Sequence, residues 1–163
     1  MYAEYRFIPR NVVQLTLFSD YSLRILLYLT MHRGRRVALP EISAAYGISK
    51  NHLVKVVQVL VVQGWVESVA GRGGGLTLAH EPKDVNIAAV VRTTEPHLNL
   101  VECFESATNT CPIDGTCGLK RVLLRAREAF FDELERHTLA DFAPHAPALI
   151  KIWQRKLKEA EAS

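Results

Sequence analysis

The sequence predicts a mainly α-helical fold: a winged helix-turn-helix with a two-stranded β-wing, followed by a long dimerisation helix. Apolar residues recur at helical spacing in three segments between residues 19 and 63. A tight turn that contains glycine, Tyr-Gly-Ile-Ser at residues 46–49, joins the second segment to the third, which is typical of a helix-turn-helix. Two β-prone runs then enclose a glycine-rich tip, which indicates a hairpin.

The composition fits one compact domain with appended helices. The 163 residues are 48% apolar and carry a net charge of +3, which argues against disorder. Residues 31–80 hold six lysines and arginines against two acidic residues, which favours a polyanionic partner. No signal peptide is visible, and no run reaches the roughly 18 apolar residues of a membrane span. We therefore expect a cytoplasmic protein with no membrane partner.

Three helices are expected in the N-terminal half. The first begins near Ser19, a good N-cap, has Asp20 in its first turn and ends near Gly34. The second covers residues 40–46, because proline suits a first helical turn and the glycine that follows breaks the pattern. The third covers residues 50–63 and is the expected recognition helix of the helix-turn-helix.

The expected wing consists of residues 65–69 and 76–79 around the tip Ala-Gly-Arg-Gly-Gly-Gly. A glycine-rich loop could instead bind a phosphate in a nucleotide site. Neither of the two usual phosphate-binding patterns, GxGxxG and GxxxxGK[ST], occurs here. The hairpin is therefore the favoured interpretation.

Three more helices are expected after the wing, over residues 85–94, 119–137 and 148–160. The second of them is long and amphipathic, and a symmetric homodimer would cover its apolar stripe. The stripe consists of Leu119, Val122, Leu123, Ala126, Phe130 and Leu134. Thr138 and Asp141 resemble a capping box. We expect the last helix to pack against the body of the dimer.

All three cysteines of the chain, Cys103, Cys111 and Cys117, lie in one short segment. Three soft thiolates on one loop suit a soft metal or an iron–sulfur cluster. An odd number of cysteines fits a disulfide framework poorly.

Two other interpretations of the cysteines stay open at this point. The first is a zinc site whose fourth ligand is His97, Asp114 or His137, although closer cysteine spacing is commoner in structural zinc sites. The second is a set of free thiols or a redox pair with a resolving cysteine.

Several polar residues are candidates for DNA contacts. In the third helix they lie opposite the apolar stripe, where Asn51 can pair with adenine and His52 with guanine or a phosphate. Arg72 stands between glycines at the wing tip and can enter a narrow minor groove. The candidates are Lys50, Asn51, His52 and Lys55 in the third helix, Arg72 in the wing, and Tyr21 and Arg24 in the first helix.

Three segments resemble the Rrf2 superfamily of winged-helix iron–sulfur regulators. They are QLTLFSDYSLRIL at residues 14–26, ISKNHLVKVV at 48–57 and GRGGGL at 71–76. Around the cysteines, LVECF, NTCPI and CGLK are most similar to the nitric-oxide-sensing repressors of that superfamily. The resemblance covers about residues 14–142.

This resemblance implies a DNA-binding transcriptional repressor, and no enzyme. It implies an iron–sulfur cluster, [4Fe-4S] or else [2Fe-2S], held by Cys103, Cys111 and Cys117. The fourth ligand would be a carboxylate from the other subunit, and Asp20 stands at the matching position. Oxygen binds iron less strongly than thiolate does, so this iron is the expected point of entry for nitric oxide. Nitrosylation would release Asp20 and lower the affinity for operator DNA.

A related class of regulators, the IscR-like sensors of cluster assembly, has a histidine ligand three residues after its last cysteine. Lys120 stands there in this chain and cannot ligate a metal while protonated. Alternatives from other classes are a thiol-dependent redox protein and a zinc-stabilised adaptor. A redox enzyme is disfavoured because the chain has no CxxC motif.

The resemblance also suggests boundaries within the chain. Members of the superfamily usually begin at the position of Val13, so we expect translation to start there and residues 1–13 to be an N-terminal extension. Residues 14–95 would form the winged-helix DNA-binding domain and residues 96–118 the cluster-binding loop. Residues 119–163 would form the dimerisation helix and the C-terminal helical tail.

Overall fold

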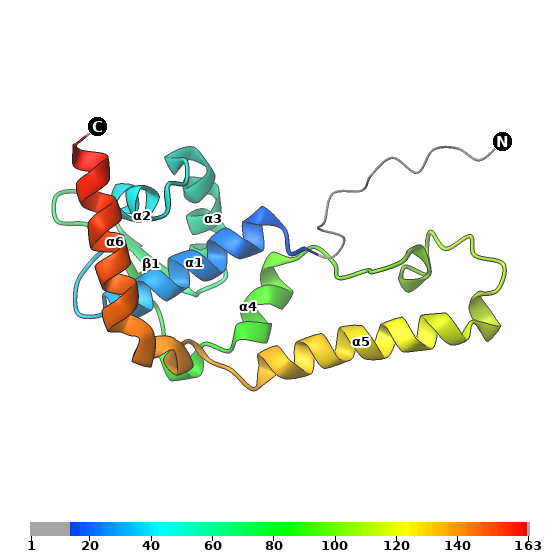
Figure 1. The fold of residues 1–163 in the computed structure, drawn as a ribbon. Helices are drawn as coiled ribbons and strands as arrows, with labels where there is room; N and C mark the ends of the chain where they lie inside the picture. The colour runs from blue at the N-terminus through cyan, green and yellow to red at the C-terminus, as the bar shows by residue number, and fades with distance from the viewer. Residues whose placement is uncertain (1–13, 163) are drawn as a thin grey trace.

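The computed structural model describes residues 14–162. The expected N-terminal extension, residues 1–13, and the expected start at Val13 lie outside the described residues. A winged helix-turn-helix forms one end of the molecule, and a long helix extends away from it (Figure 1). The helices are α1 (Leu17–Met31), α2 (Leu39–Tyr46), α3 (Lys50–Val62), α4 (Ile87–Thr94), α5 (Gly118–Glu135) and α6 (Ala146–Glu161), and the strands are β1 (Val66–Val69) and β2 (Gly75–Leu78). Short 3₁₀ helices cover Pro82–Asp84, Glu102–Phe104, Asp114–Thr116 and Leu139–His145.

The predicted helix-turn-helix is confirmed. Helix α2 ends at Gly47, whose φ of 65° lies in the left-handed region that a side chain disfavours. The Ser43 hydroxyl donates a hydrogen bond of 2.6 Å to the carbonyl of Ile48 and fixes the turn between the two helices. The apolar stripe of α3 packs into the core through Leu53, Val56, Val57 and Leu60. The opposite face of α3 is therefore free to meet a partner.

The predicted wing is also confirmed. Strands β1 and β2 are antiparallel, and Val66 pairs with Leu78 at the base of the hairpin. Val37 extends the small sheet, because its amide donates to the carbonyl of Leu76 at 3.0 Å and its carbonyl accepts from the amide of Leu76 at 2.8 Å. A Cβ on Gly74 would lie 2.1 Å from the carbonyl oxygen of Val69, so the tip requires glycine there.

The start of the first helix differs from the prediction. Thr16 is the N-cap, and its hydroxyl accepts a hydrogen bond of 3.2 Å from the amide of Ser19. Ser19 therefore lies inside the helix, where it is completely buried. Thr16 and Ser19 are both good capping residues, and the contact between Ser19 and α4 decides which of them caps the helix.

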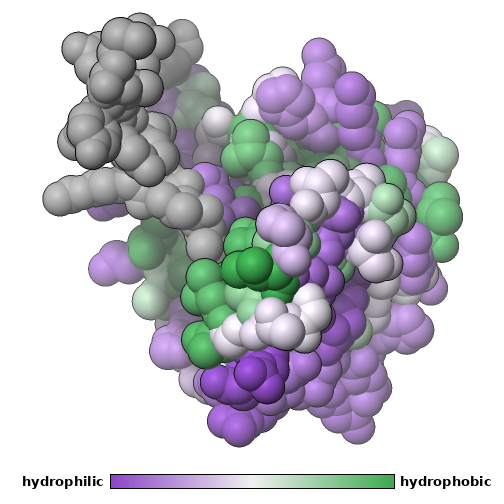
Figure 2. Space-filling model, turned by 90° about the vertical axis from the view of Figure 1, so that its right-hand side faces the viewer, coloured by the Kyte–Doolittle hydropathy of each residue, from purple (hydrophilic) through white to green (hydrophobic). Residues whose placement is uncertain are grey.

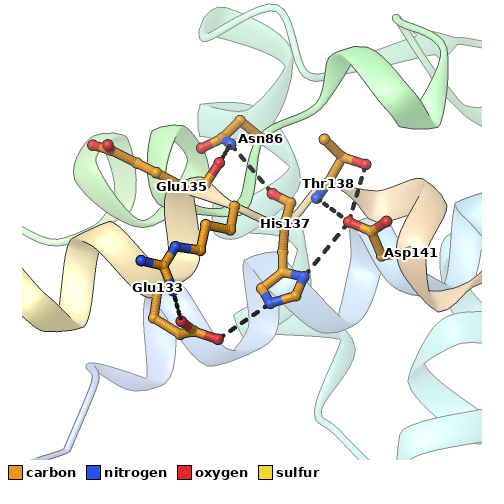
Figure 3. A network of polar contacts seen from close by, with 7 residues as sticks. Asn86, Glu133, Glu135, His137, Thr138 and Asp141 are labelled. Atoms are coloured by element: carbon orange, nitrogen blue, oxygen red, sulfur yellow. Dashed lines mark hydrogen bonds and ion pairs between the residues drawn. The ribbon is translucent and has the colours of Figure 1, made fainter.

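Helix α4 is fixed at its N-terminus to the end of α5 (Figure 3). The side-chain oxygen of Asn86 caps α4 by accepting from the amide of Ala89 at 3.2 Å. Its side-chain nitrogen donates to the carbonyls of Glu135 and His137 at 2.7 and 3.2 Å. The predicted capping box of Thr138 and Asp141 begins the 3₁₀ helix that follows. The junction thus joins α4, α5 and the C-terminal segment.

The chain itself leaves part of the predicted apolar stripe of α5 exposed. Leu119, Val122 and Phe130 are 64%, 50% and 38% exposed. The buried aromatic residue is the neighbouring Phe131, which packs against Ala88 and Val91 of α4. The stripe of α5 thus has two sides, one that contacts α4 and one that remains exposed.

The C-terminal helix does not lie along α5. Helix α6 returns to the winged helix, where the buried ring of Trp153 lies 4.6 Å from that of Tyr28 and 5.5 Å from that of Tyr46, measured between centroids. The apolar face of this helix thus covers α1 and α2 of its own chain, and the expectation that it packs against the body of a dimer stays a prediction. No helix within residues 14–162 has the length and apolar character needed to cross a bilayer.

Candidate functional site

The four predicted DNA contacts of α3 lie on one exposed face. Lys50, Asn51, His52 and Lys55 are all exposed, and the first three stand in the first turn of the helix. Recognition helices present such N-terminal side chains to base edges in the major groove. The arrangement is compatible with base contacts by Asn51 and His52 and phosphate contacts by the two lysines.

Helix α1 places its predicted DNA contacts beside this face. The ring of Tyr21 stacks on that of His52, with centroids 6.4 Å apart and planes inclined by 24°. Tyr21, His52 and Lys55 also line one apolar groove between α1 and α3, together with Leu17, Phe18 and Val56. A displacement of the first turn of α1 would therefore disturb the reading face of α3.

Arg24 is paired with the predicted cluster ligand Asp20. Two guanidinium nitrogens of Arg24 lie 2.8 and 2.9 Å from the carboxylate oxygens of Asp20, one turn earlier in α1. The hydrogen bond to Asp20 is the main cause that raises the pKa of Arg24. Because both side chains are about 40% exposed, this pair is a weak surface ion pair that a stronger ligand could replace.

Arg72 is exposed at the tip of the wing, between two glycines with positive φ. Arg36 supports the tip, because one of its guanidinium nitrogens donates a hydrogen bond of 3.4 Å to the carbonyl of Gly73. The wing thus presents an exposed cation in its tip, which a narrow minor groove would attract.

The cysteine loop, residues 103–117, precedes α5. All three cysteines are free and partly exposed. The carboxylate of Glu102 accepts hydrogen bonds from the amide and the hydroxyl of Thr110, at 2.9 and 2.7 Å, and these bonds lower the pKa of Glu102. Because Glu102 precedes Cys103 and Thr110 precedes Cys111, this contact draws two of the cysteines together.

Cys117 begins α5 as its N-cap. Its Sγ accepts from the amide of Lys120 at 3.4 Å, and the ammonium of Lys120 is paired with Asp114. This ion pair raises the pKa of Lys120, with smaller contributions from Cys103 and Cys111. Cys117 thus lies at the positive end of a helix dipole, with an ammonium nearby, a setting that suits an anionic group.

The donor set of the loop fits an iron–sulfur cluster. It offers three soft thiols, amide donors and a positive charge, the features that stabilise an anionic cluster. Within residues 14–162, however, no three or more histidine, cysteine or acidic side chains already form a metal site. Figure 1 shows the cysteine loop along the outer part of α5, away from α1, the helix that carries Asp20.

The zinc alternative loses one of its candidate ligands, His137. His137 lies at the opposite end of α5, between Glu133 and Asp141 (Figure 3). Because a helix rises about 1.5 Å per residue, a helix of this length separates His137 from Cys117 by about 25 Å or more. Asp114 is engaged by Lys120.

The end of the molecule that holds the cysteine loop also carries apolar surface. Figure 2 looks onto this end and shows hydrophobic surface surrounded by polar surface. Exposed apolar side chains in this part of the chain include Ile113, Leu119 and Val122. Contiguous apolar surface of this kind is typical of protein–protein contacts.

Sequence reasoning missed the contacts that hold the loop. Besides Glu102 and Thr110, the guanidinium of Arg127 in α5 lies 4.9 Å from the ring centroid of Phe104. The two residues are far apart in sequence and belong to no common motif, so a single sequence gives no signal for this cation–π contact.

Comparisons with known proteins agree with this arrangement. Residues 15–145 match the Rrf2 family model, described as an iron-dependent transcriptional regulator. The HTH-type transcriptional regulator NsrR of Bacillus subtilis (strain 168) is 43% identical over 145 residues, 88% of this chain and 99% of that protein. NsrR of Halalkalibacterium halodurans is 45% identical over 144 residues, 86% of this chain and 99% of that protein. The structure of IscR from T. potens superposes with a TM-score of 0.67 at 26% identity, covering 82% of this chain and 88% of that one.

Proposed function

This chain belongs to the Rrf2 family of transcriptional regulators, and we propose that it is a homodimeric repressor that senses nitric oxide through an iron–sulfur cluster. Cys103, Cys111 and Cys117 would hold the cluster, most simply [4Fe-4S], and Asp20 of the partner subunit would complete it. We place this repressor in the cytoplasm, where thiols stay reduced.

One observation carries the proposal. The three free thiols all lie in the cysteine loop that leads into α5, whereas Asp20, which would complete the ligand set, lies in α1, away from that loop (Figure 1). A second copy of the chain would overcome this separation, because a two-fold axis can bring α1 of one subunit to the cysteine loop of the other. The exposed side of α5, with Leu119, Val122 and Phe130, offers the apolar surface for such a contact.

When bound, the cluster would supply iron that reacts directly with nitric oxide. Asp20 would link that reaction to the DNA-binding face of the protein. In the described chain this carboxylate is paired with Arg24, and the residue after it, Tyr21, stacks on His52 of α3. Asp20 cannot serve Arg24 and a partner subunit equally well, so its choice of partner changes the charge that α1 presents to DNA.

The remaining residues act as DNA contacts in this proposal. Asn51 and His52 would read bases, Lys50 and Lys55 would bind phosphates, and Arg72 would enter the minor groove. A two-fold-symmetric dimer would then select a pseudo-palindromic operator. The residue ranges 14–95, 96–118 and 119–163 would serve as DNA-binding domain, cluster loop, and dimerisation helix with tail.

A regulator of cluster assembly is the nearest competing function. One observation disfavours it: the position of the expected histidine ligand is held by Lys120, whose ammonium is paired with Asp114. We therefore retain nitric oxide as the signal.

The test is an anaerobic titration of the iron-loaded protein with nitric oxide. Visible absorbance follows the cluster, and the affinity for an operator duplex selected from random sequences is measured on the same samples. We expect affinity to fall in step with the absorbance change. A Cys111→Ala variant, which lacks one thiol, should not respond. Unchanged affinity after complete reaction of the cluster would reject the function.

A further inference from the structure

Two consecutive residues at the end of α4 hold the first turn of α1. Ser19, which is completely buried, donates a hydrogen bond of 2.8 Å to the hydroxyl of Thr94, which is 6% exposed. Thr94 in turn donates to the carbonyl of Val90 at 2.9 Å. Both hydroxyls are therefore satisfied in a site where leaving either unpaired would be costly.

Glu95, which directly follows Thr94 and caps α4, adds a second contact with α1. The carboxylate of Glu95 accepts hydrogen bonds from the amide and the hydroxyl of Thr16, at 2.7 and 3.0 Å. The carbonyl of Thr16 accepts from the amide of Asp20 at 3.0 Å. Thr16, Ser19, Thr94 and Glu95 together form the α1–α4 polar contact, which holds the turn of α1 that leads into Asp20.

We propose that Ser19 and Thr94 are positioning residues that fix where the carboxylate of Asp20 is presented. The inference rests on the proposed function, because it takes Asp20 to be a cluster ligand for the partner subunit. Ser19 and Asp20 are adjacent, so a bond that fixes the rotation of α1 at Ser19 also fixes the direction of the Asp20 side chain.

The way the other end of α4 is anchored explains why the α1–α4 polar contact can fix the position of the start of α1. Asn86 fastens the N-terminus of α4 to the end of α5 (Figure 3), and α4 packs against Phe131 of the same helix. Helix α4 is thus a short rigid link between α5 and the start of α1. An apolar pair in place of Ser19 and Thr94 would keep the packing and lose the directional bond.

The contact also links the two halves of the proposed sensor. The chain that leaves α4 at Glu95 runs directly to Cys103 and the cysteine loop. In a dimer, each α1 would then be fixed to the segment that leads to its own cysteines while it presents Asp20 to the partner's. This arrangement holds the ligand in place without any contact from the cluster itself.

The test compares four variants of the full chain, with Asp20→Ala as a fifth that serves as the reference for iron release. Thr94→Val removes a hydroxyl at constant shape, Thr94→Ser restores one, and Ser19→Ala removes the other partner. Ser22→Ala is the matched control, because Ser22 is an equally buried serine of α1 whose hydroxyl donates to the carbonyl of Phe18 in the same helix, at 2.8 Å. Thermal unfolding of the metal-free proteins checks that each variant folds.

Two measurements are made on these variants. In the metal-free protein, we expect amide hydrogen exchange at residues 17–22 to accelerate about five- to tenfold in Thr94→Val and Ser19→Ala, the effect of one net hydrogen bond. In the iron-loaded protein, release of iron to a ferrous chelator should accelerate by a similar factor. Thr94→Ser and Ser22→Ala should behave like the natural sequence in both.

The outcomes separate the two proposals. If Ser19→Ala and Ser22→Ala behave alike in both measurements, the positioning role is overturned. This comparison holds even if Thr94→Val does not fold. Asp20→Ala gives the limit for iron release. If Asp20→Ala retains iron like the natural sequence, Asp20 is no ligand and the inference fails, while nitric oxide sensing by the cysteines survives. If the natural sequence binds no cluster, the proposed function fails.

Discussion

The ring of Tyr21 in α1 stacks on the ring of His52 in α3, with 6.4 Å between centroids. Tyr21 directly follows Asp20, and His52 stands in the first turn of the recognition helix. The predicted sensor ligand and a predicted base-reading residue are therefore separated by one side-chain contact.

The first prediction concerns His52 itself. His52→Ala should weaken operator binding by about 1–3 kcal/mol and relax specificity at one base pair of each half-site, because it removes a base contact. Lys55→Ala should instead weaken binding to all sequences alike and reduce the salt dependence of the affinity by about one ion. Fluorescence anisotropy with operator and scrambled duplexes at several salt concentrations measures both effects. Equal losses on both duplexes for His52→Ala would remove it from base readout.

The second prediction concerns the ion pair of Asp20 and Arg24. Asp20→Asn removes a negative charge beside the DNA face and frees Arg24 to bind a phosphate. In the metal-free protein we expect tighter binding to nonspecific DNA and a steeper salt dependence, by about 0.9 in the slope of log K against log salt. The double variant Asp20→Asn/Arg24→Gln should lose this gain. An equal gain in the double variant would show that Arg24 does not contact the DNA backbone.

The third prediction concerns pH. Arg35 donates two hydrogen bonds to Glu41, Tyr28 donates another at 2.8 Å, and the bonds from Arg35 are the main cause that lowers the pKa of Glu41 below 4.5. A carboxylate whose pKa is lower in the folded state stabilises the fold fully above its unfolded pKa. That contribution disappears as the pH falls through the folded value.

Metal-free protein should therefore lose more stability than the Glu41→Gln variant as the pH falls from about 4.3, the ordinary pKa of glutamate, to about 3. The two midpoints of thermal unfolding should converge toward the acid end of that range. Parallel curves for the two proteins would mean that Glu41 does not contribute to the acid sensitivity.

The helix-turn-helix and the wing could be predicted because their signals are local. Gly47 adopts positive φ in the turn, and the side chain that Gly74 lacks would collide with the backbone of Val69. Such requirements involve neighbouring residues and are visible in the sequence. The spacing of apolar residues in α3 similarly fixed which face is buried and which is exposed.

The contacts around the cysteines and at the start of α1 could not be predicted in this way. Ser19 was expected to be a cap, but its partner Thr94 lies 75 residues away, and a single sequence does not reveal that pairing. The contacts of Glu102 with Thr110 and of Phe104 with Arg127 likewise depend on the path of the loop. The carboxylate of Asp20 was assigned from resemblance, and its ion pair with Arg24 emerged from the structure.

The last prediction separates the two sides of α5. Phe131 is 9% exposed, packs between Ala88 and Val91, and lies under the guanidinium of Arg92, 3.9 Å from its ring centroid. Phe131→Ala should therefore destabilise the folded chain by about 3–5 kcal/mol, as large aromatic truncations in a core do. Chemical denaturation of the metal-free protein measures this loss.

Phe130 should respond differently, because it is 38% exposed and belongs to the side of α5 that a second copy would cover. Phe130→Glu should leave the secondary structure intact and weaken the dimer, since a charge would have to enter an apolar contact. Sedimentation equilibrium of both variants gives the comparison. A Phe130→Glu protein that stays as dimeric as the natural sequence would move the dimer contact to another surface, and with it the route by which Asp20 could reach the partner's cysteines.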